Sequence, residues 1–346
     1  MTQTPDEDAP HVSTPAPPAA PTPPVAYVVV PCYAEEEVLP ETCRRLAAKA
    51  RELMDRGAIA PTSRVLFVDD GSKDATWELV KKAHDDPAAA FGADAPQGLF
   101  CGISFAHNEG HQNALYAGLM AALERGCDLA ISMDADLQDD IDAMDEMLAA
   151  HAAGAEVVYG VRSSRETDTA FKRTTALAFY RLMDALGVET VYNSADYRLM
   201  GRRSLLALSQ YGEVNLFLRG IVPSLGFSTA EVYYARGERF AGESKYPLKK
   251  MVAFAIDGIT SFSVAPIRCI SALGLVSVLV SVIMVVYTLV SALTGNVVAG
   301  WSSLMISIWF VGGMLMVSLG VVGEYVGRIY LESKRRPRYI VAEELE

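Results

Sequence analysis

The chain has 346 residues, of which 51% are hydrophobic and 21% are charged, with a net charge of −12 and a mean hydropathy of +0.20. These values exclude an intrinsically disordered chain, which would be poor in apolar residues, and argue against a nucleic-acid-binding protein, which would be basic. The length allows one large domain or two ordinary ones, and the apolar residues are concentrated towards the C-terminus.

The N-terminal segment, residues 1–24, is rich in proline and contains no Phe, Trp, Tyr, Lys or Arg. A signal peptide needs a basic start followed by an apolar run, so we expect a disordered tail here instead. The five cysteines of the chain follow no metal-binding spacing and are expected to be reduced, buried thiols.

Short apolar runs alternate with helical patterns along residues 25–248, which we expect to form a cytoplasmic domain. The β-rich runs lie at residues 26–30, 65–68, 103–105, 129–133 and 157–159. Helical patterns between and after them lie at residues 36–56, 74–84, 112–125 and 142–153. This alternation predicts an α/β fold with a mixed, mostly parallel sheet that carries helices on both faces. Sites in such sheets lie at the carboxyl ends of the strands.

Polar residues follow three of these runs, at residues 31–35, 69–72 and 134–138. Ser72 or Asp74 is expected to cap the helix that follows. Asp134 and Asp136 are two positions apart, so in an extended segment both carboxylates point the same way and can share one divalent cation. The alternative for this pair is two surface acids.

Glycine-rich phosphate loops are missing from the sequence. No Gly-x-Gly-x-x-Gly follows the first run, and no Gly-x-x-x-x-Gly-Lys occurs anywhere. This argues against a Rossmann dehydrogenase and a P-loop NTPase. A nucleotide can instead be held by acidic groups at its base and ribose, with a metal ion at its diphosphate.

The C-terminal part contains no charged residue from position 269 to position 323. Two apolar runs, about 269–293 and 301–323, are each long enough to span a bilayer, so we predict a transmembrane hairpin within residues 268–328. The alternative is a pair of buried helices in a soluble core. Basic residues flank the runs on both sides, which places both termini and the polar domain in the cytoplasm of an inner-membrane, multi-pass protein. They are Lys249, Lys250 and Arg268 on one side and Arg328, Lys334, Arg335, Arg336 and Arg338 on the other.

Two further segments border the predicted hairpin. Residues 249–267 combine the two lysines with apolar positions and predict an amphipathic helix in the membrane interface, although a core helix is the alternative. Residues 329–346 are expected to form a cytoplasmic basic tail. Tyr287 and Trp301 are candidates for interfacial anchors.

Five sequence segments occur in the order seen in family 2 glycosyltransferases. The chain resembles the polyprenyl-phosphate glycosyltransferases of that family, which include bactoprenol glucosyltransferases and dolichol-phosphate mannose synthases. The resemblance covers about residues 25–330 and implies a GT-A, Rossmann-like domain. The five segments are Pro31-Cys32-Tyr33-Ala34-Glu35, Val68-Asp69-Asp70-Gly71-Ser72, Asn108-Glu109-Gly110-His111-Gln112-Asn113-Ala114, Asp134-Ala135-Asp136-Leu137-Gln138 and Glu238-Arg239-Phe240-Ala241-Gly242-Glu243-Ser244-Lys245-Tyr246.

The resemblance also implies roles for individual residues. For the nucleotide sugar these are Pro31, Tyr33, Glu35, Asp69, Asp70, His111 and Asp134. For Mg²⁺ or Mn²⁺ they are Asp134, Asp136 and Gln138, and for the acceptor phosphate they are Arg239, Ser244 and Lys245. The catalytic group is Asp134, Asp136, Asp196, Arg162, Arg173 and Arg198, in which the arginines face phosphates and Asp196 acts as a base or orients an arginine. Two positions depart from the family pattern: Ala34 stands where Asn is frequent, and His111 stands where Lys is common.

The expected reaction is the transfer of a hexose, in our interpretation from UDP-glucose, to a membrane polyprenyl phosphate such as undecaprenyl or dolichyl phosphate. A lipid phosphate is already ionised, so we expect one displacement with inversion, without an obligatory base. GDP-mannose is the first alternative donor. A processive polysaccharide synthase and a non-catalytic scaffold that binds nucleotide sugars are the alternative functions. As partners we expect a second copy bound through the membrane helices, a flippase, and a downstream glycosyltransferase that uses the sugar lipid.

Overall fold

The computed structural model describes residues 22–346 except 93–94, 164–193, 214–215, 236, 238–264 and 295–299. Its strands are β1 (Ala26–Cys32), β2 (Arg64–Asp69), β3 (Phe100–Phe105), β4 (Leu129–Ser132), β5 (Val157–Arg162), β6 (Ser194–Gly201), β7 (Thr229–Tyr234) and β8 (Val341–Leu345). Its helices are α1 (Leu39–Asp55), α2 (Thr76–Asp85), α3 (Pro87–Phe91), α4 (His111–Glu124), α5 (Ala143–Ala152), α7 (Arg202–Leu208), α8 (Leu218–Ser224), α10 (Ala265–Leu293) and α11 (Trp301–Ser333). Every strand and helix expected between residues 26 and 159 is confirmed, with small shifts at the ends.

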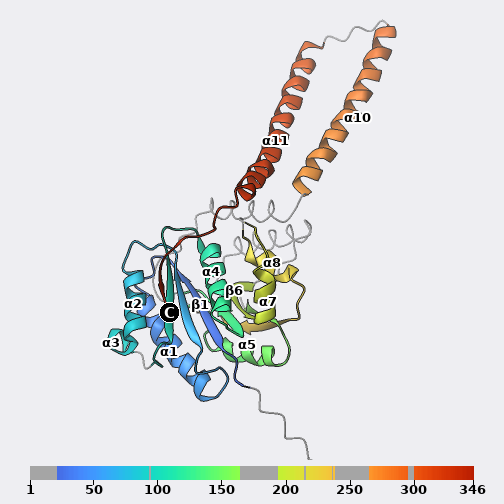
Figure 1. The fold of residues 1–346 in the computed structure, drawn as a ribbon. Helices are drawn as coiled ribbons and strands as arrows, with labels where there is room; N and C mark the ends of the chain where they lie inside the picture. The colour runs from blue at the N-terminus through green and yellow to red at the C-terminus, as the bar shows by residue number, and fades with distance from the viewer. Residues whose placement is uncertain are drawn as a thin grey trace, which may run out of the picture.

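The strands form one mixed sheet in the order β7-β5-β6-β4-β1-β2-β3-β8 (Figure 1). β1 pairs in parallel with β2 and β4, β2 with β3, and β5 with β7. β6 is antiparallel to both of its neighbours, and β8 is antiparallel to β3. Strands β6, β7 and β8 were not predicted from the sequence. The reversal at β6 matters for function, because it brings the start of that strand to the carboxyl end of β4.

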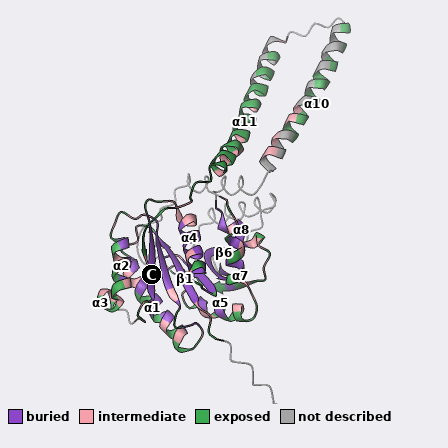
Figure 2. Ribbon diagram, viewed as in Figure 1, coloured by how far each residue is buried: buried purple, intermediate pink, exposed green. Residues whose placement is uncertain are grey.

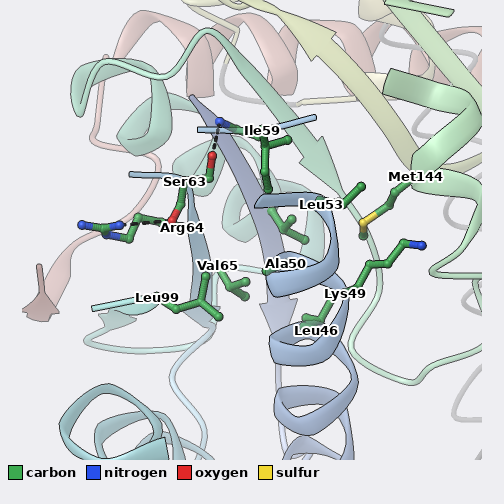
Figure 3. A pocket seen from close by; sticks show the side chains of 12 residues that line it. Leu46, Lys49, Ala50, Leu53, Ile59, Ser63, Arg64, Val65, Leu99 and Met144 are labelled. Atoms are coloured by element: carbon green, nitrogen blue, oxygen red, sulfur yellow. Dashed lines mark hydrogen bonds between the residues drawn. The ribbon is translucent and has the colours of Figure 1, made fainter. Parts of the chain in front are cut away.

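Helices cover both faces of the sheet, as predicted. Helices α1, α2 and α5 bury apolar side chains in one core cluster, and α4, α7 and α8 do so in the other. A cavity of about 10 Å³ lies between α1 and the first two strands, lined mainly by apolar side chains such as Leu46 and Leu53 (Figure 3). Because a cavity of this volume is at the lower limit for one water molecule, it is a packing gap and not a ligand site.

Gly118 allows α4 to lie directly on β1 and β2. A Cβ at this position would lie 2.3 Å from Val29 Cγ1 and 2.8 Å from Val68 Cγ2, and both valines are fully buried. Since β-branched side chains in a sheet core cannot move away, any larger residue would push the helix off the sheet. The first residue of α4 is His111, so this close packing also sets the position of a predicted site residue.

Replacing Gly118 by Ala is therefore expected to destabilise the domain by about 1–3 kcal/mol, because overpacking outweighs the better helix propensity of Ala. Thermal unfolding followed by circular dichroism in detergent measures this change. Gly212 is the matched control, since a Cβ there would have no neighbour within 4 Å and Gly212→Ala should leave the melting temperature unchanged. Equal melting temperatures for both variants would contradict the close approach of α4 to the sheet.

The last residues of the chain form part of the sheet. The segment expected as a basic tail instead contains the end of α11 and the edge strand β8, which pairs with β3. Glu343 accepts a hydrogen bond from Trp77 Nε1 at 2.8 Å and lies 3.0 Å from Lys81 Nζ. Tyr339 stacks on Phe105 with 4.9 Å between ring centroids. Two of the five residues of β8 are glutamates and four are exposed, so the segment carries little strand signal of its own. The free edge of β3 makes it a strand.

Deleting residues 341–346 is expected to lower the melting temperature by roughly 4–8 °C, because the ladder and the Glu343 contacts together contribute about 2 kcal/mol. Removal of Glu346 alone is the control and should change nothing, since this residue lies beyond β8. Differential scanning fluorimetry of the full-length protein in detergent checks both deletions. Equal melting temperatures for the parent protein and both deletion variants would contradict the pairing of β8 with the sheet.

Helices α10 and α11 run side by side away from the sheet (Figure 1). Large apolar side chains are exposed along both helices, among them Leu275 at 73% and Met316 at 71% (Figure 2). Within the described residues, one segment, Phe310–Ser333, is long and apolar enough to cross a membrane, and Ala272–Met284 is a shorter apolar stretch. Both predicted runs thus fall in helices, and the crossing of a membrane by two helices stays a prediction.

Candidate functional site

The predicted site lies at the carboxyl edge of the central strands. Ser132 at the end of β4 pairs with Arg198 of β6, so the residues after Ser132 run past the residues before Arg198. Asp134 and Asp196 meet there. His111, at the start of α4, lies between them, with its Nε2 3.7 Å from Asp134 Oδ1 and 3.4 Å from Asp196 Oδ2. Three residues that are far apart in the sequence are thereby brought together.

The segment with the three predicted metal ligands, Asp134, Asp136 and Gln138, is a tight loop. Asp136 Oδ1 accepts a hydrogen bond from Gln138 N at 3.1 Å, and Thr42 Oγ1 donates to the Ala135 carbonyl at 2.8 Å. Leu137 adopts a φ of 57°, a left-handed conformation that its buried side chain holds in place. This turn places the backbone amide of Gln138 on the Asp136 carboxylate.

The charges around Asp134 fit a divalent cation. Burial raises the pKa of Asp134, and the negative charges of Asp196 and Asp136 raise it further, against the opposing effect of His111. A cation would relieve this repulsion, and carboxylate and amide oxygens are the ligands that Mg²⁺ and Mn²⁺ accept. The described residues contain no group of three or more His, Cys, Asp or Glu side chains arranged for a metal. A bound ion would therefore need Gln138, water or a substrate oxygen to complete its coordination.

Asp196 is the centre of a charged network beneath the loop. It is buried, and its oxygens lie 2.7 Å from Arg198 Nη2 and 3.0 Å from Arg219 Nη2. Although burial alone raises its pKa, Arg219, His111 and Arg198 hold the pKa of Asp196 well below the usual range. A carboxylate with such a low pKa is a poor proton acceptor. The contacts with Arg198 and Arg219 fit the predicted role of orienting arginines, and the choice between the two predicted roles of Asp196 stays a prediction.

Arg198 itself lies below the site. Its side chain is 2% exposed, and besides Asp196 it contacts the Leu218 carbonyl, with Nη1 3.3 Å from that oxygen. The structure differs from the expectation that Arg198 faces a substrate phosphate: its side chain lies on the same face of β6 as that of Asp196, two residues away, and is buried against the start of α8.

Arg219 takes the position at the surface of the network and was not found from the sequence. Its Nε and Nη2 both contact the Asp196 carboxylate, at 3.2 and 3.0 Å, and its side chain is 33% exposed. Gln112 Oε1 accepts a hydrogen bond from Leu218 N at 3.0 Å, which fixes the start of α8 next to α4. The signal available in the sequence was a single arginine within the apolar run 216–222.

The protonation of His111 resolves one departure from the family pattern. Burial lowers its pKa, but the hydrogen bond with Asp196 and the charge of Asp134 raise the pKa of His111 to about 9. The imidazole is therefore protonated at neutral pH. It supplies a positive charge at the position where Lys is common.

On the nucleotide side, Asp69 and Asp70 are buried and shape loops. Asp69 accepts a hydrogen bond from Ser104 Oγ at 2.9 Å. Asp70 accepts hydrogen bonds from Glu109 N at 2.7 Å and Gly110 N at 2.9 Å, so it holds the loop that leads to His111. Burial raises the pKa of Asp70, and these amides oppose that effect. The structure thus gives both acids a loop-holding role besides any contact with a nucleotide.

Residues 31–35 leave the sheet at the end of β1. Pro31 is buried in the strand, whereas Tyr33 is 44% exposed and free to stack on a planar ring. Glu35 is half-buried, and its amide donates to Thr76 Oγ1 at 2.9 Å. Ala34 has a φ of 54° and donates its amide to Ser72 Oγ at 3.0 Å. Because Asn tolerates this left-handed conformation better than Ala, the geometry explains the family preference at position 34.

Neither of the two candidates is the N-cap residue of α2, which is Ala75 and has no side-chain cap hydrogen bond. Asp74 Oδ1 accepts a hydrogen bond from Thr76 N at 3.1 Å, at the start of the helix. Ser72 instead holds Ala34, as described above.

The remaining predicted residues divide into two groups. Arg162 lies at the end of β5, where its Nη2 is 3.7 Å from Asp139 Oδ1. Asp139 is buried, and burial together with the charge of Asp134 raises its pKa to about 6. The other predicted residues, Arg173, Arg239, Ser244 and Lys245, lie outside the described residues, as do the tail 1–21 and most of the expected interfacial helix.

Comparison with known proteins identifies the family. Residues 27–208 match the family described as Glycosyl transferase family 2. The chain belongs to glycosyl transferase family 2. The predicted membership is thus confirmed, and the protein is a glycosyltransferase with a GT-A-like mixed α/β domain.

Relatives of this family 2 glycosyltransferase cover nearly its whole length. It is 51% identical to the "Uncharacterized glycosyltransferase YkoT" of Bacillus subtilis, over 92% of this chain and 91% of that protein. It is 39% identical to the "Bactoprenol glucosyl transferase" of Shigella phage SfV, over 92% of this chain and 98% of that protein. Among solved structures, glucosyl-3-phosphoglycerate synthase from Mycobacterium tuberculosis is similar with a TM-score of 0.44 and 18% identity, over 69% of this chain and 79% of that one.

Proposed function

We propose that this glycosyltransferase moves a glucose residue from UDP-glucose to a polyprenyl phosphate at a membrane, with inversion at the anomeric carbon. The names of the bactoprenol glucosyl transferases that it resembles support the acceptor class and the sugar. The observation that carries the proposal is that the charged site lies at the same edge of the sheet at which the chain arrives from α11. Val341 pairs with Phe105 at the carboxyl end of β3 and Leu345 pairs with Gly102, so the chain reaches the sheet from the site side.

A membrane is the partner that fits α10 and α11. At 1.5 Å per residue, their 29 and 33 residues extend over about 44 and 50 Å, more than the roughly 30 Å of a hydrocarbon core. Exposed leucine, valine and methionine side chains along both helices would be unfavourable in water and favourable in lipid. Lipid around the helix pair would hold the site edge at the height of a lipid phosphate.

The return of the chain to its own sheet supports an even number of crossings. The sheet begins with β1 and is completed by β8, which follows α11. A chain that leaves a cytoplasmic domain and rejoins it must cross the bilayer twice or not at all. The predicted hairpin satisfies this condition, whereas a single transmembrane span does not.

The chemistry follows from the groups at the edge. Asp134 and Asp136 would hold Mg²⁺ or Mn²⁺ with Gln138 beside them, and the ion, when bound, neutralises charge on the departing diphosphate. His111 adds positive charge next to Asp134 and Arg219 adds it next to Asp196, where phosphate groups of the donor and acceptor would meet. The acceptor phosphate is ionised at neutral pH, so the reaction needs orientation more than proton removal. The low pKa of Asp196 is consistent with this requirement.

The test is a transfer assay with the full-length protein in membranes. Undecaprenyl phosphate is incubated with radiolabelled UDP-glucose, UDP-galactose, UDP-N-acetylglucosamine or GDP-mannose, in the presence of Mg²⁺ or Mn²⁺. We expect a chloroform-soluble, mild-acid-labile product from UDP-glucose. Product from GDP-mannose alone would replace the sugar assignment, and no lipid-linked product from any donor would overturn the proposed function.

A further inference from the structure

A buried acid next to the predicted metal loop joins three elements of the domain. Asp139 is 3% exposed, and its Oδ1 accepts a hydrogen bond from Tyr234 OH at 2.5 Å. The same oxygen lies 3.7 Å from Arg162 Nη2. Asp139 follows β4, Arg162 ends β5 and Tyr234 ends β7, so one carboxylate links the carboxyl ends of three strands.

Further contacts hold this corner rigid. The Tyr197 ring packs edge-on against Tyr234, with 5.4 Å between centroids, and Tyr197 OH donates to the Asp140 carbonyl at 2.9 Å. The amide of Gly237 donates to the Gln138 carbonyl at 2.9 Å. The loop that carries the predicted metal ligands is thus attached to β6 and to the chain after β7.

Burial removes the Asp139 carboxylate from water, and the surrounding contacts offset only part of this unfavourable desolvation free energy. Its Oδ2 has no hydrogen-bond partner among the described residues. A buried carboxylate with an unpaired oxygen lowers the stability of the folded domain, and an apolar residue at this position would stabilise the fold at least as well. Positioning a cation is a function that an apolar residue cannot perform, and Arg162 is the cation within reach.

We propose that Asp139 and Tyr234 are positioning residues that fix the Arg162 guanidinium beside the Asp134–Gln138 loop for contact with a substrate phosphate. This inference rests on the proposed function. A long arginine side chain otherwise loses rotamer entropy when it binds a phosphate, and fixing it beforehand removes part of this loss. Tyr234 contributes by holding Oδ1 on the side that faces Arg162.

The test is a double-mutant cycle between Asp139 and Arg162 in the full-length protein. Asp139→Asn keeps the size of the side chain and removes its charge, and we expect kcat/KM for transfer to fall 10- to 100-fold. In an Arg162→Lys background, Asp139→Asn should lower kcat/KM by less than a further twofold, because the guanidinium that Asp139 positions is already absent. Tyr234→Phe should reduce kcat/KM about fivefold. The control is Tyr233→Phe on the same strand, which is 61% exposed, contacts Glu231, and should match the parent protein.

A binding measurement makes the test independent of the lipid acceptor. The affinity for UDP is measured by titrating UDP, in the presence of MnCl₂, into each of the four proteins of the cycle. This gives the same comparison without turnover. Coupling between Asp139 and Arg162, in UDP binding or in transfer, supports the inference. If the cycle shows coupling in UDP binding but the parent protein makes no sugar lipid, only the proposed function is overturned. Independent, multiplicative effects in both measurements, with a fall in melting temperature to match, would reduce Asp139 to a structural residue and overturn the inference.

Discussion

Replacing Asp136 by Asn is expected to lower kcat about 10³-fold while the protein stays folded and membrane-bound. Asp136 is buried at the turn, where its carboxylate and that of Asp134 would share the cation. The amide has the same shape but no charge, so the ion would lose one of its two anionic ligands. Loss of the charge that compensates a departing diphosphate accounts for several kcal/mol of the barrier.

The matched control for this change lies four residues further along the same loop. Asp140 is exposed, and its carboxylate accepts a hydrogen bond from the nearby Asp142 amide at 3.0 Å, so Asp140→Asn should retain full activity. Binding of Mn²⁺ in the presence of UDP, followed by electron paramagnetic resonance, gives a second readout. Weaker Mn²⁺ binding in Asp136→Asn but not in Asp140→Asn is expected. Full activity of Asp136→Asn would remove Asp136 from the metal site.

Replacing Arg219 by Gln is expected to lower kcat/KM about 10²-fold, because the site loses the partly exposed positive charge beside Asp134 and Asp196. Arg219→Lys should recover only part of the activity. The guanidinium contacts Asp196 through both Nε and Nη2, and an ammonium group cannot reproduce two contacts in one plane. Steady-state kinetics with both substrates varied measures this difference.

Arg203 provides the comparison for Arg219. It lies on the neighbouring helix α7, is exposed, and stacks over the Phe227 ring at 5.5 Å. Arg203→Gln removes the same charge from the domain without touching the network around Asp196, and should leave kcat/KM within twofold. Equal losses in the two variants would mean that net charge matters and that the position of Arg219 does not.

Local sequence pattern was sufficient for the first half of the domain. The apolar runs of β1 to β5 are continuous. Helices α1, α2 and α5 bury one face and α4 is buried almost all round, so the burial of apolar residues decides the type of these elements. The pair Asp134 and Asp136 could also be found from the sequence, because two residues at this spacing in an extended segment point to the same side. These features depend on residues within about 15 positions of one another.

Three other features depend on contacts between distant segments. β8 is a strand because β3 offers a free edge more than 230 residues earlier in the chain. Arg219 belongs to the site because α8 packs beside α4 and places its guanidinium on Asp196. Asp139 joins the ends of three strands that no local pattern brings together. A sequence pattern carries little information on such contacts, because each side chain owes its role to a partner that only the fold supplies.

By itself, the sequence determined that this protein has a domain of alternating strands and helices, a pair of acids suited to a metal, and two long apolar runs near the C-terminus. The tertiary structure alone decided which charges act together. The antiparallel strand β6 places Asp196 at the end of β4, which buries Arg198 and brings Arg219 to the surface of the site. The physical reason is that electrostatic interactions depend on distance and burial, and both are set by the pairing of strands that are remote in the chain.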